Sequence, residues 1–189
     1  DRLTGREGGP GSDDLEVQLS TVFRNMFALT GLKYEIDLWE CEAVFDKHNS
    51  DREPTPNMAE LLDALDRAGI RTAVISNTVI SGRAMEQAVN YQLPNSKMEF
   101  VLTSADYLFK KPHGDMFLAA AKISGVKPHD CWYCGDNFGA DVVGACNAGM
   151  FAVHYEVASD EAFTYLEYSG KPYLKINDWK ELVDKLPTE

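Results

Sequence analysis

The strongest constraint on the fold is a strict alternation of two residue patterns between positions 58 and 155. Apolar runs of strand length alternate with amphipathic stretches of helical length. The helical patterns cover 58–68, 82–90, 114–124 and 139–148, and the strand patterns cover 71–75, 99–103, 131–135 and 150–155. This order predicts an α/β fold with a doubly wound, mostly parallel sheet, in which ligands bind beyond the carboxyl ends of the strands. A last strand at 173–176 and a helix at 178–186 follow.

The segment before this alternation has a different character. Apolar residues at helical spacing predict a helix that is capped by Ser12 or Asp13 and runs to about residue 29, and a second helix covers 36–45. Two prolines two residues apart, at 54 and 56, then exclude a helix and indicate a boundary. We therefore expect a small, partial helical cap lobe at 1–53 and an α/β core at 54–189.

Charge and hydropathy exclude several classes of partner. The 189 residues carry a formal net charge of -12, which argues against nonspecific binding to nucleic acid or to an anionic membrane surface. No apolar run approaches the roughly 20 residues that a membrane-spanning helix needs, and the residues that follow Asp1 do not form a secretory signal. The sequence predicts a cytoplasmic protein, and it carries no signal for an oligomeric state.

Polar side chains occur at three equivalent places in the alternation. A hydroxyl and an amide follow the strand at 71–75, two lysines precede the helix at 114–124, and two carboxylates follow the strand at 131–135. Each feature alone is common as a turn residue, a solvated charge or a helix-capping acid. Because the carboxyl ends of parallel strands meet at one edge, we expect the three to converge. They are Ser76 with Asn77, Lys110 with Lys111, and Asp136 with Asp141.

The acidic pair has the chemistry of a magnesium site. Asp136 and Asp141 supply hard oxygen ligands, which Mg²⁺ prefers. Gly135 lets the backbone approach a ligand, and the N-terminus of the following helix favours anionic groups. A bound Mg²⁺ together with a phosphate group is the pair of ligands that this turn predicts.

In this order the motifs resemble those of the haloacid dehalogenase-like superfamily, of the cap-bearing phosphatase type, over about residues 54–155. The resemblance implies that Ser76 is a catalytic, phosphate-binding hydroxyl and that Asn77 helps to bind the substrate. It implies that Lys111 is the catalytic lysine that neutralises charge and binds the substrate. Asp136 and Asp141 correspond to the Mg²⁺ ligands. Lys110 is the second choice for the lysine.

The superfamily's nucleophile belongs to an Asp-x-Asp motif at the end of the first strand, and the sequence lacks this motif. Asp46 is the nearest imitation and would serve a capless form of the fold. The charged residues Glu40 and Glu42 argue against a buried central strand there and favour a helix. We expect instead that the first strand is missing, which leaves two sheet edges and a slot between them.

The resemblance implies a Mg²⁺-dependent phosphohydrolase that cleaves a small phosphomonoester through an aspartyl phosphate. Because this chain lacks a convincing nucleophile, we expect little or no activity from it. One alternative is a catalytically inactive module that binds a ligand or a protein partner. The others are a capless enzyme that uses Asp46 and a phospho-acceptor signalling domain.

Overall fold

A computed structural model describes residues 15–186. The chain order of helices and strands agrees with the alternation expected for the core. A 3₁₀ turn at Pro128–Asp130 precedes β3, and a π-helical turn at Phe138–Val142 follows it. The elements are α1 (Leu19–Thr30), α2 (Leu38–Asn49), α3 (Met58–Arg67), β1 (Thr72–Ser76), α4 (Gly82–Gln92), β2 (Met98–Thr103), α5 (Ser104–Tyr107), α6 (Gly114–Ser124), β3 (Trp132–Gly135), α7 (Val143–Ala148), β4 (Phe151–Tyr155), β5 (Phe163–Tyr168), β6 (Lys171–Ile176) and α8 (Lys180–Val183).

The strands form two sheets rather than the one continuous sheet that the alternation suggests. β1 pairs with β2 in parallel, and the second sheet has the order β3-β4-β6-β5. Its strands are parallel except for β5, which runs antiparallel to β6. In the described part of the chain no ladder hydrogen bonds connect β1 with β3. Within residues 15–186, each of these two strands therefore has one edge without a backbone partner.

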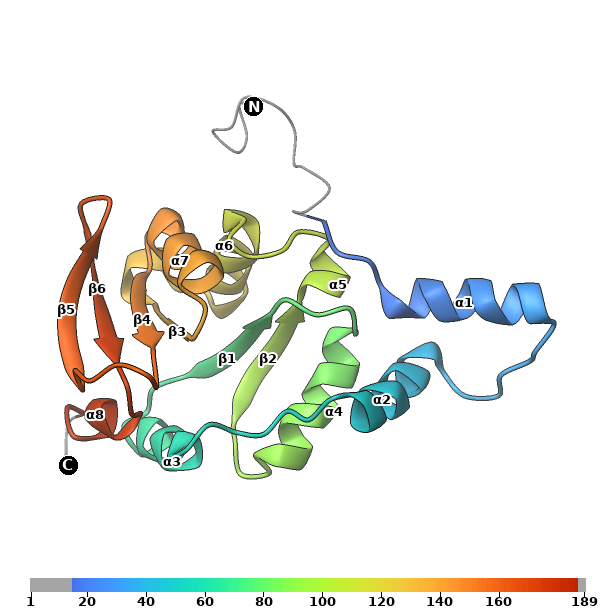
Figure 1. The fold of residues 1–189 in the computed structure, drawn as a ribbon, viewed down its shortest axis with the longest axis horizontal. Coiled ribbons are helices and arrows are strands. Elements are labelled where there is room, and N and C mark those ends of the chain that lie inside the picture. Colours follow the sequence, from blue (N-terminus) through green and yellow to red (C-terminus); the bar gives the residue numbers. More distant parts are fainter. Residues whose placement is uncertain (1–14, 187–189) are drawn as a thin grey trace.

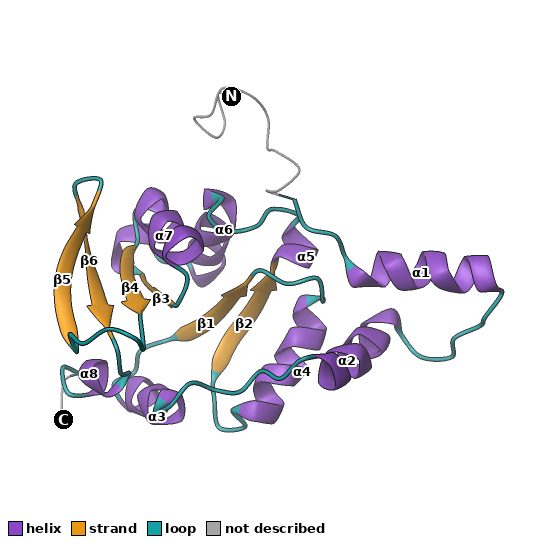
Figure 2. Ribbon diagram, in the orientation of Figure 1, coloured by secondary structure: helices purple, strands orange, loops and turns teal. Residues whose placement is uncertain are grey.

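Helices cover both faces of the strands, which confirms the α/β, doubly wound prediction (Figure 2). Strand β4 shows the reason: its residues are apolar except for buried His154, and its successive side chains point to opposite faces. Ala152 packs with α6 and α7, whereas Val153 packs with α3 and α8. On β2, Val101 packs against α4 and Leu102 against α6.

Helices α1 and α2 form a helical arm, and α1 extends away from both sheets (Figure 1). Helix α1 buries none of its side chains, whereas α2 packs against α4 through Ala43. The second helix predicted from the sequence is present as α2. The division of the chain at residue 53 stays a prediction.

The start of the first helix differs from the prediction. Helix α1 begins at Leu19, with Gln18 as its N-cap, whereas Ser12 and Asp13 lie outside the described residues. The backbone before Leu19 is engaged elsewhere: Leu15 forms a β-bridge with Phe109, and the Leu19 N–H donates to the carbonyl of Val79 at 2.8 Å. These tertiary contacts outweigh the local helical preference of residues 15–18.

The C-terminal part contains a strand that the sequence interpretation missed. The predicted strand at 173–176 is β6, which starts at Lys171, and β5 pairs with it over its whole length. The helix predicted at 178–186 is shorter, since α8 covers Lys180–Val183. Within residues 15–186 no helix has the length and hydropathy needed to cross a membrane.

Candidate active site

Lys111 is the centre of a polar cluster where the carboxyl ends of β1 and β3 approach each other. Its Nζ lies 2.7 Å from Asp141 Oδ1, 2.8 Å from the Tyr133 hydroxyl and 3.3 Å from the carbonyl oxygen of Ile75. An ammonium group has three N–H donors, and each has an acceptor here. The side chain is only 11% exposed. Lys111 thus connects two strands that share no backbone hydrogen bonds.

Asn77 fixes the backbone of Lys111. Its Nδ2 donates to the Lys111 carbonyl at 3.0 Å, and its Oδ1 accepts the Lys111 N–H at 2.7 Å. An amide side chain supplies one donor group and one acceptor, so this pairing satisfies both backbone groups of the lysine. The structure places Asn77 beside Lys111, as predicted, and gives it a supporting contact. Its role in substrate binding stays a prediction.

Asp141 is held from both sides. Its Oδ1 accepts from Lys111, while its Oδ2 accepts the Asn137 N–H at 2.9 Å. The π-helical turn that carries Asp141 is N-capped by Asn137, whose Oδ1 accepts the Ala140 N–H at 2.9 Å. This turn directs the carboxylate inward, where it is almost fully buried.

Gly135 provides the space for that carboxylate. A Cβ atom at Gly135 would lie 2.4 Å from both Cγ and Oδ2 of Asp141, which is closer than non-bonded atoms can approach. The glycine at the end of β3 is therefore required by the Asp141 side chain as the structure has it. The sequence interpretation assigned Gly135 to backbone approach toward a ligand, and the structure shows a close side-chain contact.

Tyr133 is a site residue that the sequence interpretation missed, because it was read as part of an apolar strand. Its hydroxyl lies 3.2 Å from the Ile75 carbonyl and 3.3 Å from Asp141 Oδ1. Burial, together with the charge of Asp141, raises the pKa of the Tyr133 phenol well above its usual value. The phenol therefore stays neutral at physiological pH and keeps its proton for hydrogen bonding. Its position two residues before Gly135, on the same face of the strand, was the available signal.

Ser76 and Asp136 lie at the margins of this cluster. Ser76 ends β1 directly after Ile75, and it is opposite Thr103 of β2. Asp136 is exposed, and its carbonyl oxygen lies 3.2 Å from His154 Nε2. Its charge is a minor cause of the raised pKa of Tyr133.

Of the two lysines, Lys111 forms the ion pair with Asp141. Lys110 Nζ instead lies 3.8 Å from Glu16 Oε1. The assignment of Lys111 as the catalytic lysine stays a prediction.

The acidic pair fits Mg²⁺ only in a limited way. Residues 15–186 contain no group of three or more His, Cys, Asp or Glu side chains arranged to hold a metal. Mg²⁺ is commonly bound by one or two carboxylates and completes its shell with water and phosphate oxygens. Asp141, fixed by the Asn137 N–H, and the exposed Asp136 fit that mode of binding. The described residues do not fit a metal site built from protein ligands alone.

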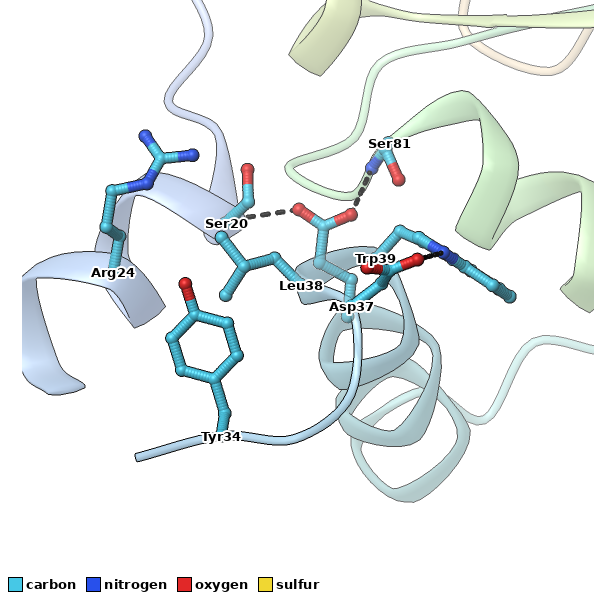
Figure 3. A pocket seen from close by; sticks show the side chains of 8 residues that line it. Ser20, Arg24, Tyr34, Asp37, Leu38, Trp39 and Ser81 are labelled. Atoms are coloured by element: carbon cyan, nitrogen blue, oxygen red, sulfur yellow. Dashed lines mark hydrogen bonds between the residues drawn. The ribbon is translucent and has the colours of Figure 1, made fainter. Parts of the chain in front are cut away.

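A separate cavity of about 410 Å³ lies between the helical arm and the N-terminus of α4 (Figure 3). Buried Glu42 of α2 is at its inner wall, where it accepts the Ser20 N–H at 2.8 Å and the Ser81 N–H at 2.9 Å. None of the residues predicted for the site lines this cavity. Its lining consists of Ser20, Arg24, Tyr34, Asp37, Leu38, Trp39, Glu42 and Ser81.

Asp46 does not occupy the position that the capless alternative requires. It lies within helix α2, and its carboxylate pairs with the guanidinium of Arg52. A nucleophile of that alternative would have to follow a central strand. The structure therefore argues against Asp46 as the nucleophile, and the reason is the helical pattern that it shares with Trp39.

The α/β fold and the order of the site residues agree with a known class of hydrolases, the haloacid dehalogenase-like enzymes. Residues 15–155 match the family described as "Haloacid dehalogenase-like hydrolase", and the chain belongs to this family.

Relatives in this family include enzymes named for phosphatase activity. Over 134 residues the chain is 32% identical to the glyceraldehyde 3-phosphate phosphatase of Methanothermobacter thermautotrophicus, covering 70% of this chain and 58% of that protein. It is 28% identical over 131 residues to the haloacid dehalogenase-like hydrolase domain-containing protein 3 of Xenopus laevis, covering 69% of this chain and 51% of the relative. The chain thus spans little more than half the length of these relatives.

Solved structures agree on the fold. A HAD phosphatase from Thermococcus onnurineus is similar with a TM-score of 0.60 at 23% identity, covering 88% of this chain and 71% of that one. A dehalogenase with an intermediate complex is similar with a TM-score of 0.60 at 21% identity, covering 90% of this chain and 80% of that one. Because both identities are low, these likenesses bear on the fold and do not distinguish phosphatase from dehalogenase chemistry.

Proposed function

We propose that the chain is part of a Mg²⁺-dependent phosphohydrolase that cleaves a small phosphomonoester through an aspartyl phosphate. The observation that carries this proposal is the buried contact between Lys111 and Asp141 at the carboxyl ends of β1 and β3. An ammonium group at this point offsets the charge of a phosphoryl group, and a carboxylate beside it can hold Mg²⁺.

Within the proposal each residue has a distinct task. Ser76 and the backbone N–H groups after β1 donate to the phosphoryl oxygens, and Lys111 neutralises their charge. Asp136 and Asp141 hold Mg²⁺, which, when bound, supplies charge neutralisation and orientation. Asn77 keeps the Lys111 backbone in place. Tyr133 keeps its proton and donates a hydrogen bond to the Ile75 carbonyl.

The proposed nucleophile is an aspartate that residues 15–186 do not supply. The free edges of β1 and β3 support this part of the proposal, because a parallel strand between them would pair with both and would end beside Lys111. In the structure the Ile75 carbonyl accepts hydrogen bonds from the side chains of Lys111 and Tyr133. A carboxylate at the end of such a strand would meet the ammonium of Lys111.

The substrate class is tested by comparing three compounds. Glyceraldehyde 3-phosphate, an aryl phosphate and a 2-haloacid are offered, with Mg²⁺, to a protein extended upstream through an Asp-x-Asp strand. We expect phosphate release from one or both phosphomonoesters and no halide release. Halide release alone would replace the phosphatase proposal with a dehalogenase.

Metal binding is tested on the chain itself. Calorimetric titration with Mg²⁺ is expected to show binding that disappears in Asp136→Asn and persists in Asp115→Asn, a control at an exposed acid of α6. Mg²⁺ binding that survives Asp136→Asn would contradict the assigned ligand pair. Absence of turnover in the extended protein, with Mg²⁺ binding intact, would favour a binding module without catalysis.

A further inference from the structure

We infer that Glu16 is a positioning residue that holds together two loops: the one that follows Ser76 and carries Asn77, and the one that carries Lys111. This inference rests on the proposed function only for its effect on phosphate binding. Glu16 lies immediately before the helical arm, and its side chain is 10% exposed. None of the sequence motifs pointed to it, because its partners are about 90 residues away.

The first link runs from Glu16 to the loop after β1. Its Oε2 accepts a hydrogen bond from the Ser104 hydroxyl at 2.8 Å. Ser104 is completely buried, and its Oγ accepts the Thr78 N–H at 2.9 Å. Thr78 follows Asn77 directly, so the carboxylate orders the loop that carries the predicted phosphate-binding groups.

The second link runs from Glu16 to the lysine loop. Its Oε1 lies 3.8 Å from Lys110 Nζ, and its N–H donates to the Leu108 carbonyl at 2.7 Å. Leu108 has a φ of 72°, a conformation that is strained for a residue with a side chain and needs support from its neighbours. Glu16 thus contacts the segment that leads into Lys111 at two points.

The two links close a ring. Glu16 connects through Ser104 to Thr78, and Asn77 pairs with the backbone of Lys111. Lys110 then leads back to Glu16. A ring of this kind transmits a change at one member to the opposite side, because each contact limits the freedom of the next. Removal of the Glu16 carboxylate should loosen the Asn77–Lys111 pairing, which Glu16 does not touch.

Amide hydrogen exchange of the whole chain tests the inference. In Glu16→Ala we expect exchange of the Thr78 and Lys111 amides to become about tenfold faster, while amides of β4 stay unchanged. Glu16→Gln keeps an acceptor for Ser104 and loses the charge near Lys110, so it should give a smaller increase. Glu99→Gln, which removes the charge of an exposed ion pair with Arg71, is the matched control and should change neither amide.

Two results would overturn the inference. In one, Thr78 responds and Lys111 does not, which would restrict Glu16 to its own contact. In the other, β4 amides accelerate as much as the loop amides, which would assign Glu16 to general stability.

Titration with inorganic phosphate and Mg²⁺ is a separate readout, in which Glu16→Ala should weaken binding about threefold or more. Failure of the parent chain to bind phosphate would count against the proposed function, whereas the exchange result would still decide the role of Glu16.

Discussion

At the scale of single residues, Gly135 is the position where the least change has the largest expected effect. In Gly135→Ala the new methyl group meets Asp141 at 2.4 Å, so the carboxylate must leave its place beside Lys111. Overpacking of this kind destabilises by about 1–3 kcal/mol. Urea unfolding of the variant and the parent measures this loss of stability. Gly139→Ala is the control, since a Cβ there would meet only Asn137 Oδ1 at 3.5 Å, and an equal loss in both variants would contradict the prediction.

The buried ion pair between Lys111 and Asp141 should contribute to the stability of the fold. Asp141→Asn leaves the buried ammonium without its counter-charge, and breaking such a pair from one side destabilises by about 3–5 kcal/mol. Asp136→Asn removes an exposed carboxylate and should change stability by less than about 0.5 kcal/mol. Thermal or urea unfolding of both variants checks the contrast. Similar losses at the two positions would mean that the ion pair is not the stabilising contact.

Because the pKa of Tyr133 is raised, we expect the free energy of unfolding to depend on pH in the alkaline range. The usual phenol pKa is 10.0, and burial raises it well above that value in the folded chain. Above pH about 10 the unfolded chain therefore releases a proton that the folded chain retains, and the free energy of unfolding falls as pH rises. Below that pH this group contributes no slope. The stability advantage of the parent over Tyr133→Phe should shrink between pH about 9 and about 11; a constant difference in urea unfolding would refute this assignment.

At the scale of helices and strands, Glu42 ties three helices together. Its two carboxylate oxygens accept N–H groups at the N-termini of α1 and α4, while its backbone belongs to α2. Glu42→Ala leaves both N–H groups without an acceptor, at about 1–3 kcal/mol for each one that stays buried. Hydrogen exchange at the Ser20 and Ser81 amides should accelerate. Val44→Ala, at an exposed position of the same helix, should leave both amides unchanged.

The elements that the sequence predicted best are those with local signals at both ends. Helix α6 starts at Gly114 and ends at Ser124, as predicted, because His113 caps it and Gly125 adopts a left-handed conformation. Helix α1 starts later than predicted, since contacts with distant loops engage the residues before it. Strand β5 was missed because the prediction extended a parallel alternation, and an antiparallel hairpin does not follow that rule.

The site likewise contains residues that local sequence patterns predict and residues that only long-range contacts bring into place. The approach of Lys111, Asn77 and Asp141 follows from the alternation, because it places their loops at the carboxyl ends of strands. Tyr133 and Glu16 act across the fold, on partners that no spacing in the sequence connects. Long-range contacts of this kind require the arrangement of the strands, which the sequence pattern does not specify in detail.

At the scale of the whole molecule, the division into two sheets predicts uneven stability. β4 and β6 are each paired on both sides, whereas β1 and β3 are each paired on one side. Side chains, mainly Lys111 and Tyr133, connect β1 to β3 at their carboxyl ends. Amides at an unpaired strand edge exchange by smaller openings than those in a central strand. We expect the unpaired amides of β1 and β3 to exchange at least about tenfold faster than those of β4.

Lys111→Met makes this prediction more specific. The variant keeps the length of the side chain and removes the donors that reach Ile75 and Asp141, so the two sheets lose their main polar connection. Exchange should then accelerate in β1 and β3 more than in β6, which lies beyond β4. Lys97→Met, which breaks an exposed ion pair with Asp66, is the control and should leave the pattern as it is. Equal acceleration in all strands would show that the two sheets open as one unit and that Lys111 does not couple them.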